Sequence, residues 1–246
     1  MSGAPYSPAI IVATLREFLE GRDLEVEGAS FDRDRIISDM AHGYVRIDAR
    51  RKAGGARRGA RDLVVALVLS ADGKYAQNGP ALRTLLAGIG GEAPAALDEL
   101  ILVVEEEFLD KKNVMDVFRA FAGELKAAAL KAAEPKAAEP KDAKIDEVRG
   151  ADPEGRVPFC NVYPYHVFAM NIPRHLSVPP HRIMSAEEVA DLLATQHKQF
   201  HNLPSIYVND PPVIWCGGRV GQVVEITRPS EVAGTAMYYR RIIARP

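Results

Sequence analysis

The sequence predicts an α/β chain (α+β overall) built from two domains. Two continuous apolar runs, 63–69 and 100–104, have the length and β-branched composition of buried strands. A helix predicted over 81–89 separates them, and strand–helix–strand order with short connections favours a parallel pair joined by a crossover helix. Short strand, helix and turn signals then fill residues 173–246, which indicates a second, smaller domain.

Composition limits the function classes. With 246 residues, 47% of them hydrophobic, the chain can bury a core. A net charge of -2 excludes a generally basic nucleic-acid binder, so any DNA contact needs a local patch. Membrane-length apolar runs and signal-peptide features are missing, so we expect an intracellular protein in solution. Cys160 and Cys216 lack metal-ligand spacing and are expected to be buried free thiols in a reducing compartment.

The N-terminal domain is expected to begin and end with helices. Residues 8–20 carry apolar side chains at helical spacing, at Ile11, Leu15, Phe18 and Leu19. The strand over 63–69 should end in a tight turn at Asp72-Gly73. Asn113 is predicted to be the N-cap of a helix that runs through Val117, Phe118, Phe121 and Leu125.

Residues 126–155 differ in composition from the rest of the chain. Lys-Ala-Ala-Glu-Pro is repeated here, and the repeat contains no side chain large enough to anchor it in a core. Because each proline removes a donor and clashes with the preceding turn, the helix should fray into a solvated spacer. The segment is therefore predicted to be a linker or insertion, with a partner-docking segment as the alternative.

The C-terminal elements are indicated by caps and turns. Ser185 and Glu188 form a capping box that opens a helix to about residue 198. Asp210 is predicted to cap a short helix with Pro211 at its first position, ending at Gly217-Gly218. Gly221 allows a turn into a strand over 222–226. Ser230 and Gly234 suit a tight loop that carries residues 228–231, and a last strand is expected over 237–243.

Two histidines, His175 and His181, lie downstream of Cys160. Their six-residue spacing does not fit zinc, whose ligands are usually two to five residues apart in sets of four. Prolines at 173, 179 and 180 predict an extended segment over the domain surface. A packed, hydrogen-bonded pair of histidines is the preferred interpretation.

One dense basic run stands out at the end of the first quarter of the chain. It contains Arg50, Arg51, Lys52, Arg57, Arg58 and Arg61, with glycines and without an acid. Such a run can bind phosphates through counterion release, without sequence preference. It is a candidate DNA contact, and a solvated loop or an anchor on another subunit is the equal alternative.

An ordered series of C-terminal motifs resembles a known family. The motifs are Leu203-Pro204-Ser205-Ile206, Asp210-Pro211, Gly221 to Ile226, Arg228-Pro229-Ser230-Glu231 to Gly234, and Tyr239-Arg240. Together they resemble the C-terminal assembly domain of the fifth-largest subunit of eukaryotic RNA polymerases, which has its counterpart in the archaeal enzyme. The resemblance is strong from about residue 171 and loose before it. It implies an N-terminal jaw domain with restriction-endonuclease-like topology but without nuclease chemistry.

The resemblance implies four segments and a function. These are a jaw core at 1–125, the linker or insertion at 126–155, the end of the jaw and passage at 156–172, and the assembly domain at 173–246. It implies a non-catalytic subunit of DNA-dependent RNA polymerase that docks on the largest subunit and lines the downstream DNA, without cofactor, metal, membrane or small-molecule substrate. A cellular member would be nuclear; a viral one would be found in host nucleus or cytoplasm and in virions. The implied interface residues are His175, Pro179, His181, Asp210, Pro211, Arg219, Arg228, Pro229, Ser230, Glu231, Gly234, Tyr239 and Arg240.

Departures from the family pattern leave alternatives open. Ile214, Val220 and Ala236 stand where the family commonly has basic or aromatic residues, which points to a divergent or viral lineage with a diverged neighbouring subunit. One alternative is an adaptor that docks on polymerase without being a core subunit. The other is a metal-dependent nuclease that uses Asp62 and Asp72, with acids from 105–107. The turn composition around Asp72 argues against the nuclease.

Overall fold

The chain folds into two compact units. In the computed structural model, unit 1 comprises residues 1–134 and 154–170, and unit 2 comprises 135–153 and 171–246. The structure describes residues 7–27, 33–52, 62–70, 72–92, 96–109, 112–132, 158–197, 199–230, 232 and 234–244. The mixture of helices and sheets confirms the predicted α+β class.

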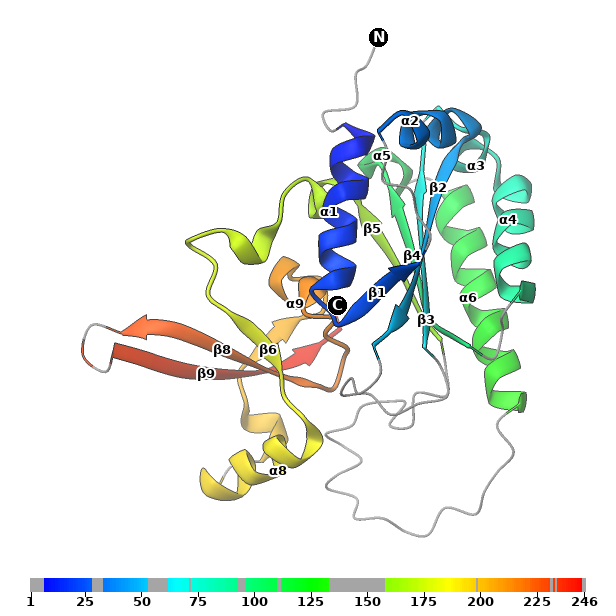
Figure 1. The fold of residues 1–246 in the computed structure, drawn as a ribbon. Coiled ribbons are helices and arrows are strands. Elements are labelled where there is room, and N and C mark those ends of the chain that lie inside the picture. Colours follow the sequence, from blue (N-terminus) through cyan, green and yellow to red (C-terminus); the bar gives the residue numbers. More distant parts are fainter. Residues whose placement is uncertain are drawn as a thin grey trace. The chain divides into compact units, whose positions relative to one another are not determined.

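Unit 1 is built on a five-stranded sheet with strand order β1-β2-β3-β4-β5 (Figure 1). Its strands are β1 (Leu24–Glu27), β2 (Tyr44–Arg51), β3 (Leu63–Leu69), β4 (Leu97–Val104) and β5 (Phe159–Pro164). The first three strands are antiparallel neighbours, whereas β3, β4 and β5 are parallel. The predicted parallel pair is confirmed: both β3 and β4 are buried along their whole length, as apolar strands covered on both faces should be.

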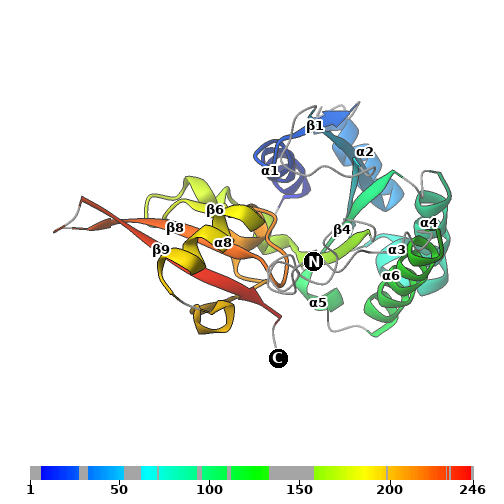
Figure 2. The same cartoon turned by 90° about the horizontal axis from the view of Figure 1, so that it is seen from below.

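Helices cover both faces of this sheet (Figures 1 and 2). They are α1 (Pro8–Glu20), α2 (Arg33–His42), α3 (Lys74–Gln77), α4 (Gly79–Glu92), α5 (Glu106–Leu109), α6 (Lys112–Ala132) and the 3-10 helix η1 (Tyr165–Phe168). On one face, α4 and α6 pack on alternate side chains of β3 and β4, such as Leu67 and Leu102. On the other face, α1 buries its predicted apolar stripe, and its Phe18 meets the ring of Phe168 edge-on at 5.1 Å.

The predicted boundaries of α6 are wrong at both ends. The helix begins at Lys112, so Asn113 lies in its first turn and not at the N-cap. It continues to Ala132, beyond the expected end near Leu125. The Lys/Ala composition explains the extension, because both residues are strong helix formers and the first proline comes only at 135. The rest of the predicted linker, from 133, lies outside the described residues.

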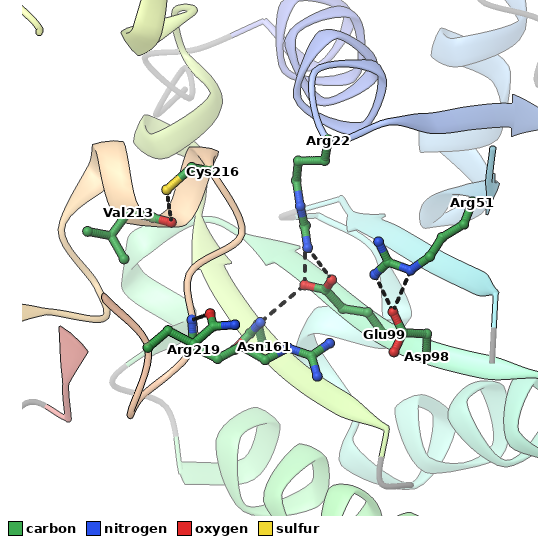
Figure 3. A network of polar contacts seen from close by, with 9 residues as sticks. Arg22, Arg51, Asp98, Glu99, Asn161, Val213, Cys216 and Arg219 are labelled. Carbon is green, nitrogen blue, oxygen red and sulfur yellow. Dashed lines mark hydrogen bonds and ion pairs between the residues drawn. The ribbon is translucent and has the colours of Figure 1, made fainter. Parts of the chain in front are cut away.

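Two buried acids at the start of β4 form ion pairs that the sequence did not predict (Figure 3). Glu99, with a side chain only 1% exposed, accepts a 2.6 Å hydrogen bond from Arg22 in the α1–β1 turn. Asn161 on β5 donates to the same carboxylate at 3.3 Å. Arg51 at the end of β2 pairs with Asp98. These contacts join the turn before β1 and the end of β2 to the centre of the sheet.

Both cysteines are free, as predicted, but they are half-buried and not fully buried as expected. Burial, followed by the nearby charge of Glu99, raises the pKa of the Cys160 thiol to about 12. Because only the thiolate attacks disulfide reagents, we expect Cys160 in the folded protein to react at pH 8 roughly 10²-fold or more slowly than in urea. The Cys216→Ser variant isolates this thiol for a colorimetric assay with an aromatic disulfide. Equal rates in the folded and unfolded chains would contradict the expectation.

Unit 2 contains a four-stranded sheet with strand order β6-β8-β9-β7. The strands are β6 (His181–Ile183), β7 (Ser205–Tyr207), β8 (Val223–Ser230) and β9 (Gly234–Ile243). Its helices are α8 (Ala186–Thr195), α9 (Pro211–Trp215) and the 3-10 helices η2 (Ile172–Arg174) and η3 (Phe200–Asn202). Residues Val224, Ile226 and Ile242 pack with Val213 of α9, and we call this side the α9 face. Val223 and Tyr239 pack with Val189 of α8 on the opposite side, the α8 face.

Most cap and turn predictions in unit 2 are confirmed. Ser185 and Glu188 make both bonds of a capping box, and the helix that follows ends at Thr195, slightly earlier than expected. Asp210 occupies the N-cap of α9 with Pro211 next to it, but its side chain makes no capping bond. Gly217 and Gly221 have positive φ angles of 70° and 89°, as their turns require. Among the described residues, no helix is both long and apolar enough to span a membrane.

Candidate subunit interface

The strands β8 and β9 form a two-stranded ribbon that extends beyond the rest of unit 2 (Figures 1 and 2). Neighbouring strands support only its base: β6 pairs with residues 224–226 and β7 with 241–243. β8 and β9 continue to pair with each other as far as Ser230 and Gly234. The distal ribbon, defined here as 227–230 with 234–240, is therefore covered by neither outer strand.

Arg228 to Ser230 form the last residues of β8, so the expected loop is wrong for Arg228 and Pro229, but the chain does reverse between Ser230 and Gly234, the two residues expected to suit a tight loop. Arg228 lies opposite Ala236 in the ladder, and Pro229 lies opposite Thr235. Val232 lies in a turn between β8 and β9, and Glu231 lies outside the described residues. Gly234 opens β9 with a φ angle of 71°, a conformation that favours glycine.

The α9 face of the ribbon carries several of the predicted interface residues. His181, Ile226 and Tyr238 form one cross-strand row, and Ile183, Val224 and Arg240 form the next. Arg228 lies on the same face, with its guanidinium carbon 5.2 Å from the centre of the Tyr238 ring, a cation–π distance. This part of the face therefore combines two cations with an exposed aromatic ring.

Asp210 adds an acid beside this group. Partial burial raises the pKa of its carboxyl, and the charges of His181 and Arg240 act in the opposite direction. Arg240 donates to the carbonyl oxygen of Ser205 at 3.1 Å, which fixes the guanidinium beside the start of β7. Three residues predicted separately, from the starts of β6 and α9 and from β9, are thus close enough to interact.

The remaining predicted residues are placed elsewhere on unit 2. His175 is exposed and accepts a bond from the amide of Ser177, while His181 Nδ1 lies 2.6 Å from the carbonyl oxygen of Pro179. Both histidines are hydrogen-bonded, as predicted, but to local backbone, and the exposed His175 is not packed as expected. Tyr239 packs on the α8 face. Arg219 lies just before the turn that leads into β8, and its backbone amide donates to the side chain of Gln222.

Exposed apolar side chains are frequent on unit 2. Met237 and Tyr238 on the distal ribbon are 51% and 47% exposed, although both lie within a strand. Others are Leu176, Tyr207, Val220 and Val232. Of the positions where the sequence departs from the family pattern, Ile214 is buried in α9, Val220 is exposed and Ala236 is half-buried. Exposed apolar side chains that lie together on one strand, as Met237 and Tyr238 do on β9, are typical of a protein–protein contact.

A charged network on the α8 face was missed by the sequence reasoning. Arg182 bonds bidentately to Glu188 at 2.8 and 3.0 Å and also reaches Glu225 at 3.1 Å. The bond from the Ser185 backbone, followed by the one from Arg182, lowers the pKa of Glu188. The capping box already identified Glu188 from the sequence. Its partners Arg182 and Glu225 lie opposite each other on β6 and β8, so only the strand register could identify them. The network fixes the start of α8 to the sheet.

The candidate DNA contacts separate into two groups. Arg50 bonds to Glu27 and Asp62, and Arg51 bonds to Asp98, so both side chains already have carboxylate partners. Lys52 is exposed at the end of β2. Arg57, Arg58 and Arg61 lie outside the described residues. The same Asp62 was a proposed nuclease ligand, and no metal-holding group of three or more acidic, histidine or cysteine side chains occurs in the described residues.

Known proteins share both units. Residues 170–242 match the family model described as RNA polymerase Rpb5, C-terminal domain. Over 227 residues the chain is 32% identical to a protein of African swine fever virus named DNA-directed RNA polymerase RPB5 homolog, with 92% of each chain covered. The chain belongs to the RPB5 family of RNA polymerase subunits. The predicted resemblance is therefore confirmed, and it extends beyond the C-terminal motifs.

Other relatives of this RPB5-family chain match its C-terminal part. The RNA polymerase subunit Rpo5 of Thermococcus kodakarensis is 42% identical over 73 residues, which cover 30% of this chain and 89% of that protein. The subunit of RNA polymerases I, II and III named RPABC1 from Caenorhabditis briggsae is 46% identical over 74 residues, covering 30% and 35% of the two chains. The chain is thus a component of a DNA-directed RNA polymerase, with other polymerase subunits as partners.

Proposed function

We propose that unit 2 docks this RPB5-family subunit on the largest polymerase subunit, and that the protein has no catalytic activity of its own. The observation that carries the proposal is the α9 face of the distal ribbon, where Arg228, Tyr238 and Arg240 lie together. An aromatic ring beside arginines is the composition of interaction hot spots. Arg240 uses one bond on Ser205, and a guanidinium has five N–H donors, so capacity remains for a partner carboxylate.

The test is co-expression of the tagged chain with the other polymerase subunits encoded by the same genome, followed by mass-spectrometric stoichiometry. The wild-type chain should recover the largest subunit one-to-one. The Arg228→Ala/Arg240→Ala variant should recover roughly tenfold less or lower, because hot-spot truncations cost about 2 kcal/mol or more. The matched control is Arg16→Ala/Arg83→Ala, which removes two exposed arginines from α1 and α4 of unit 1.

Two results would contradict the proposal in different ways. Equal recovery of the double variant and its control would remove the α9 face from the interface. Association that is substoichiometric and exchanges rapidly would favour the adaptor that visits the polymerase without being a core subunit. Adding Glu231→Ala to the variants extends the test to the residue after β8.

The second part of the proposed function concerns unit 1 as a jaw beside downstream DNA. Its support is the basic run that follows β2, in which Lys52 is exposed and no acid occurs between 51 and 61. Arg50 and Arg51 are already paired with carboxylates. The DNA contact in this proposal is therefore made by Lys52, Arg57, Arg58 and Arg61. The location of the protein follows from its polymerase: the nucleus for a cellular enzyme, and the infected cell and virion for a viral one.

A further inference from the structure

The two edges of the distal ribbon differ chemically. In the ladder between β8 and β9, even-numbered residues face each other as bonded pairs: Ile242, for example, donates to Gln222. Odd-numbered residues direct their backbone groups outward, as the bonds from Thr227 to Pro180 and from Arg241 to Pro204 show. The alternation continues without a register shift along the ribbon. The odd-numbered residues therefore define what each edge offers to a partner.

The outer edge of β8 is blocked. After Thr227, whose amide donates to Pro180, the next outward position is Pro229, which has no N–H to donate. Proline at an edge is a common device against pairing with another strand. The location of Pro229 also explains why a proline is tolerated inside β8, since the missing donor faces away from β9.

The outer edge of β9 is open. Its outward positions are Thr235, Met237 and Tyr239, each with an N–H and a C=O, and they contain no proline. Within the described residues, β7 pairs with β9 only at 241–243 and therefore stops before this stretch. The edge is flanked by the exposed side chains of Met237 on the α8 face and Tyr238 on the α9 face. A row of backbone groups with apolar side chains on both faces is a template for a fifth strand.

We infer that the β9 edge over 235–239 accepts an extended segment of a partner polymerase subunit, which adds a strand to the sheet of unit 2. The inference rests on the proposed docking function and names its mode. On the α9 face the added strand would run beside Tyr238 and Arg240, so it should carry a carboxylate there. A second copy of this chain fits less well, because edge-to-edge pairing would place two sets of Arg228 and Arg240 on one face.

The test removes one backbone N–H donor from the outer edge of β9 and leaves the hydrogen bonds between β8 and β9 intact. Met237→Pro removes the amide at the centre of the edge, and Met237→Ala is the matched control that loses the side chain but keeps the N–H. Pro229→Ala, which restores a donor on the opposite edge, is the second control. Each full-length variant is co-expressed with the largest polymerase subunit. We expect Met237→Pro to recover roughly tenfold less of that subunit than Met237→Ala, and Pro229→Ala to recover as much as wild type.

Hydrogen exchange of the ribbon amides gives an independent readout. The amides of Thr235, Met237 and Tyr239 should exchange quickly in the free chain and become protected in the complex. Far-UV circular dichroism of the free variants checks that Met237→Pro keeps the fold. If wild type binds the largest subunit but Met237→Pro and Met237→Ala bind equally, strand addition is overturned while docking stands. If wild type binds no polymerase subunit, the docking proposal itself fails. A wild-type dimer in sedimentation that Met237→Pro abolishes would identify a second copy as the occupant and overturn the inference.

Discussion

Replacing Glu99 by alanine should lower the free energy of unfolding by about 3–5 kcal/mol, the usual effect of removing one partner from a buried ion pair. The reason is the environment of Arg22, whose side chain is only 7% exposed and would lose its carboxylate. Burial alone would lower the pKa of Arg22, but the charge and hydrogen bonds of Glu99 outweigh it and raise that pKa. Because the ordinary pKa of an arginine side chain is about 12.5 or higher, Arg22 stays protonated without Glu99 and is left buried without this carboxylate. Asn161 would lose an acceptor as well.

Urea unfolding followed by far-UV circular dichroism measures this effect. Trp215, the sole tryptophan in the sequence, belongs to unit 2, so its fluorescence follows the other unit separately. Glu20→Ala is the matched control, because it breaks the exposed pair with Arg16 and should change stability by less than about 0.5 kcal/mol. An Arg22→Met/Glu99→Met variant should recover much of the loss. A Glu99→Ala protein as stable as the control would show that the pair contributes little to the fold.

Neutralising the basic run should weaken the hold of the assembled polymerase on downstream DNA and flatten its dependence on salt. For Lys52→Gln/Arg57→Gln/Arg58→Gln/Arg61→Gln, the slope of log affinity against log salt should fall in magnitude by about 3.6, or about 0.9 for each lost phosphate contact. The measurement is DNA binding by the purified complex across a salt series. Sequence preference should stay the same, since phosphate contacts carry no sequence information.

A control with the same change in net charge distinguishes a contact from a general effect. Lys126→Gln/Lys131→Gln/Lys136→Gln/Lys141→Gln removes four positive charges from the end of α6 and the segment after it. Its salt slope should match wild type. If both fourfold variants change the slope equally, the basic run acts through overall charge; if neither does, it is an anchor on protein or a solvated loop.

Local signals predicted much of the fold. The apolar run of β3 indicated a strand buried on both faces because a parallel strand under two helix layers has no solvent side. Ser185 and Glu188 identified the start of α8 because both bonds of a capping box lie within four residues. The family motifs of unit 2 identified residues that the fold then brought together, such as His181, Asp210 and Arg240.

The failures arise where long-range contacts decide the outcome. Residues 228–231 were predicted to belong to a loop, yet Arg228 to Ser230 continue β8, and only the register shows that the missing donor of Pro229 faces outward. The apolar run predicted a strand over 100–104, yet β4 starts at Leu97, and the two acids before the run, Asp98 and Glu99, are paired with Arg51 and Arg22. Arg22 and Glu99 are 77 positions apart in sequence, so periodicity could not connect them.

The position of β5 has a consequence for the synthesis and evolution of the chain. The sheet of unit 1 gains its last strand only at 159–164, after the segment that follows α6. A ribosome must therefore release residue 164 before that sheet can close, and the intervening repeat connects two parts of one folded unit. The entropy of closing such a connection grows only with the logarithm of its length, so doubling it costs about 0.6 kcal/mol. Relatives can therefore lengthen or shorten the Lys-Ala-Ala-Glu-Pro repeat at small thermodynamic cost.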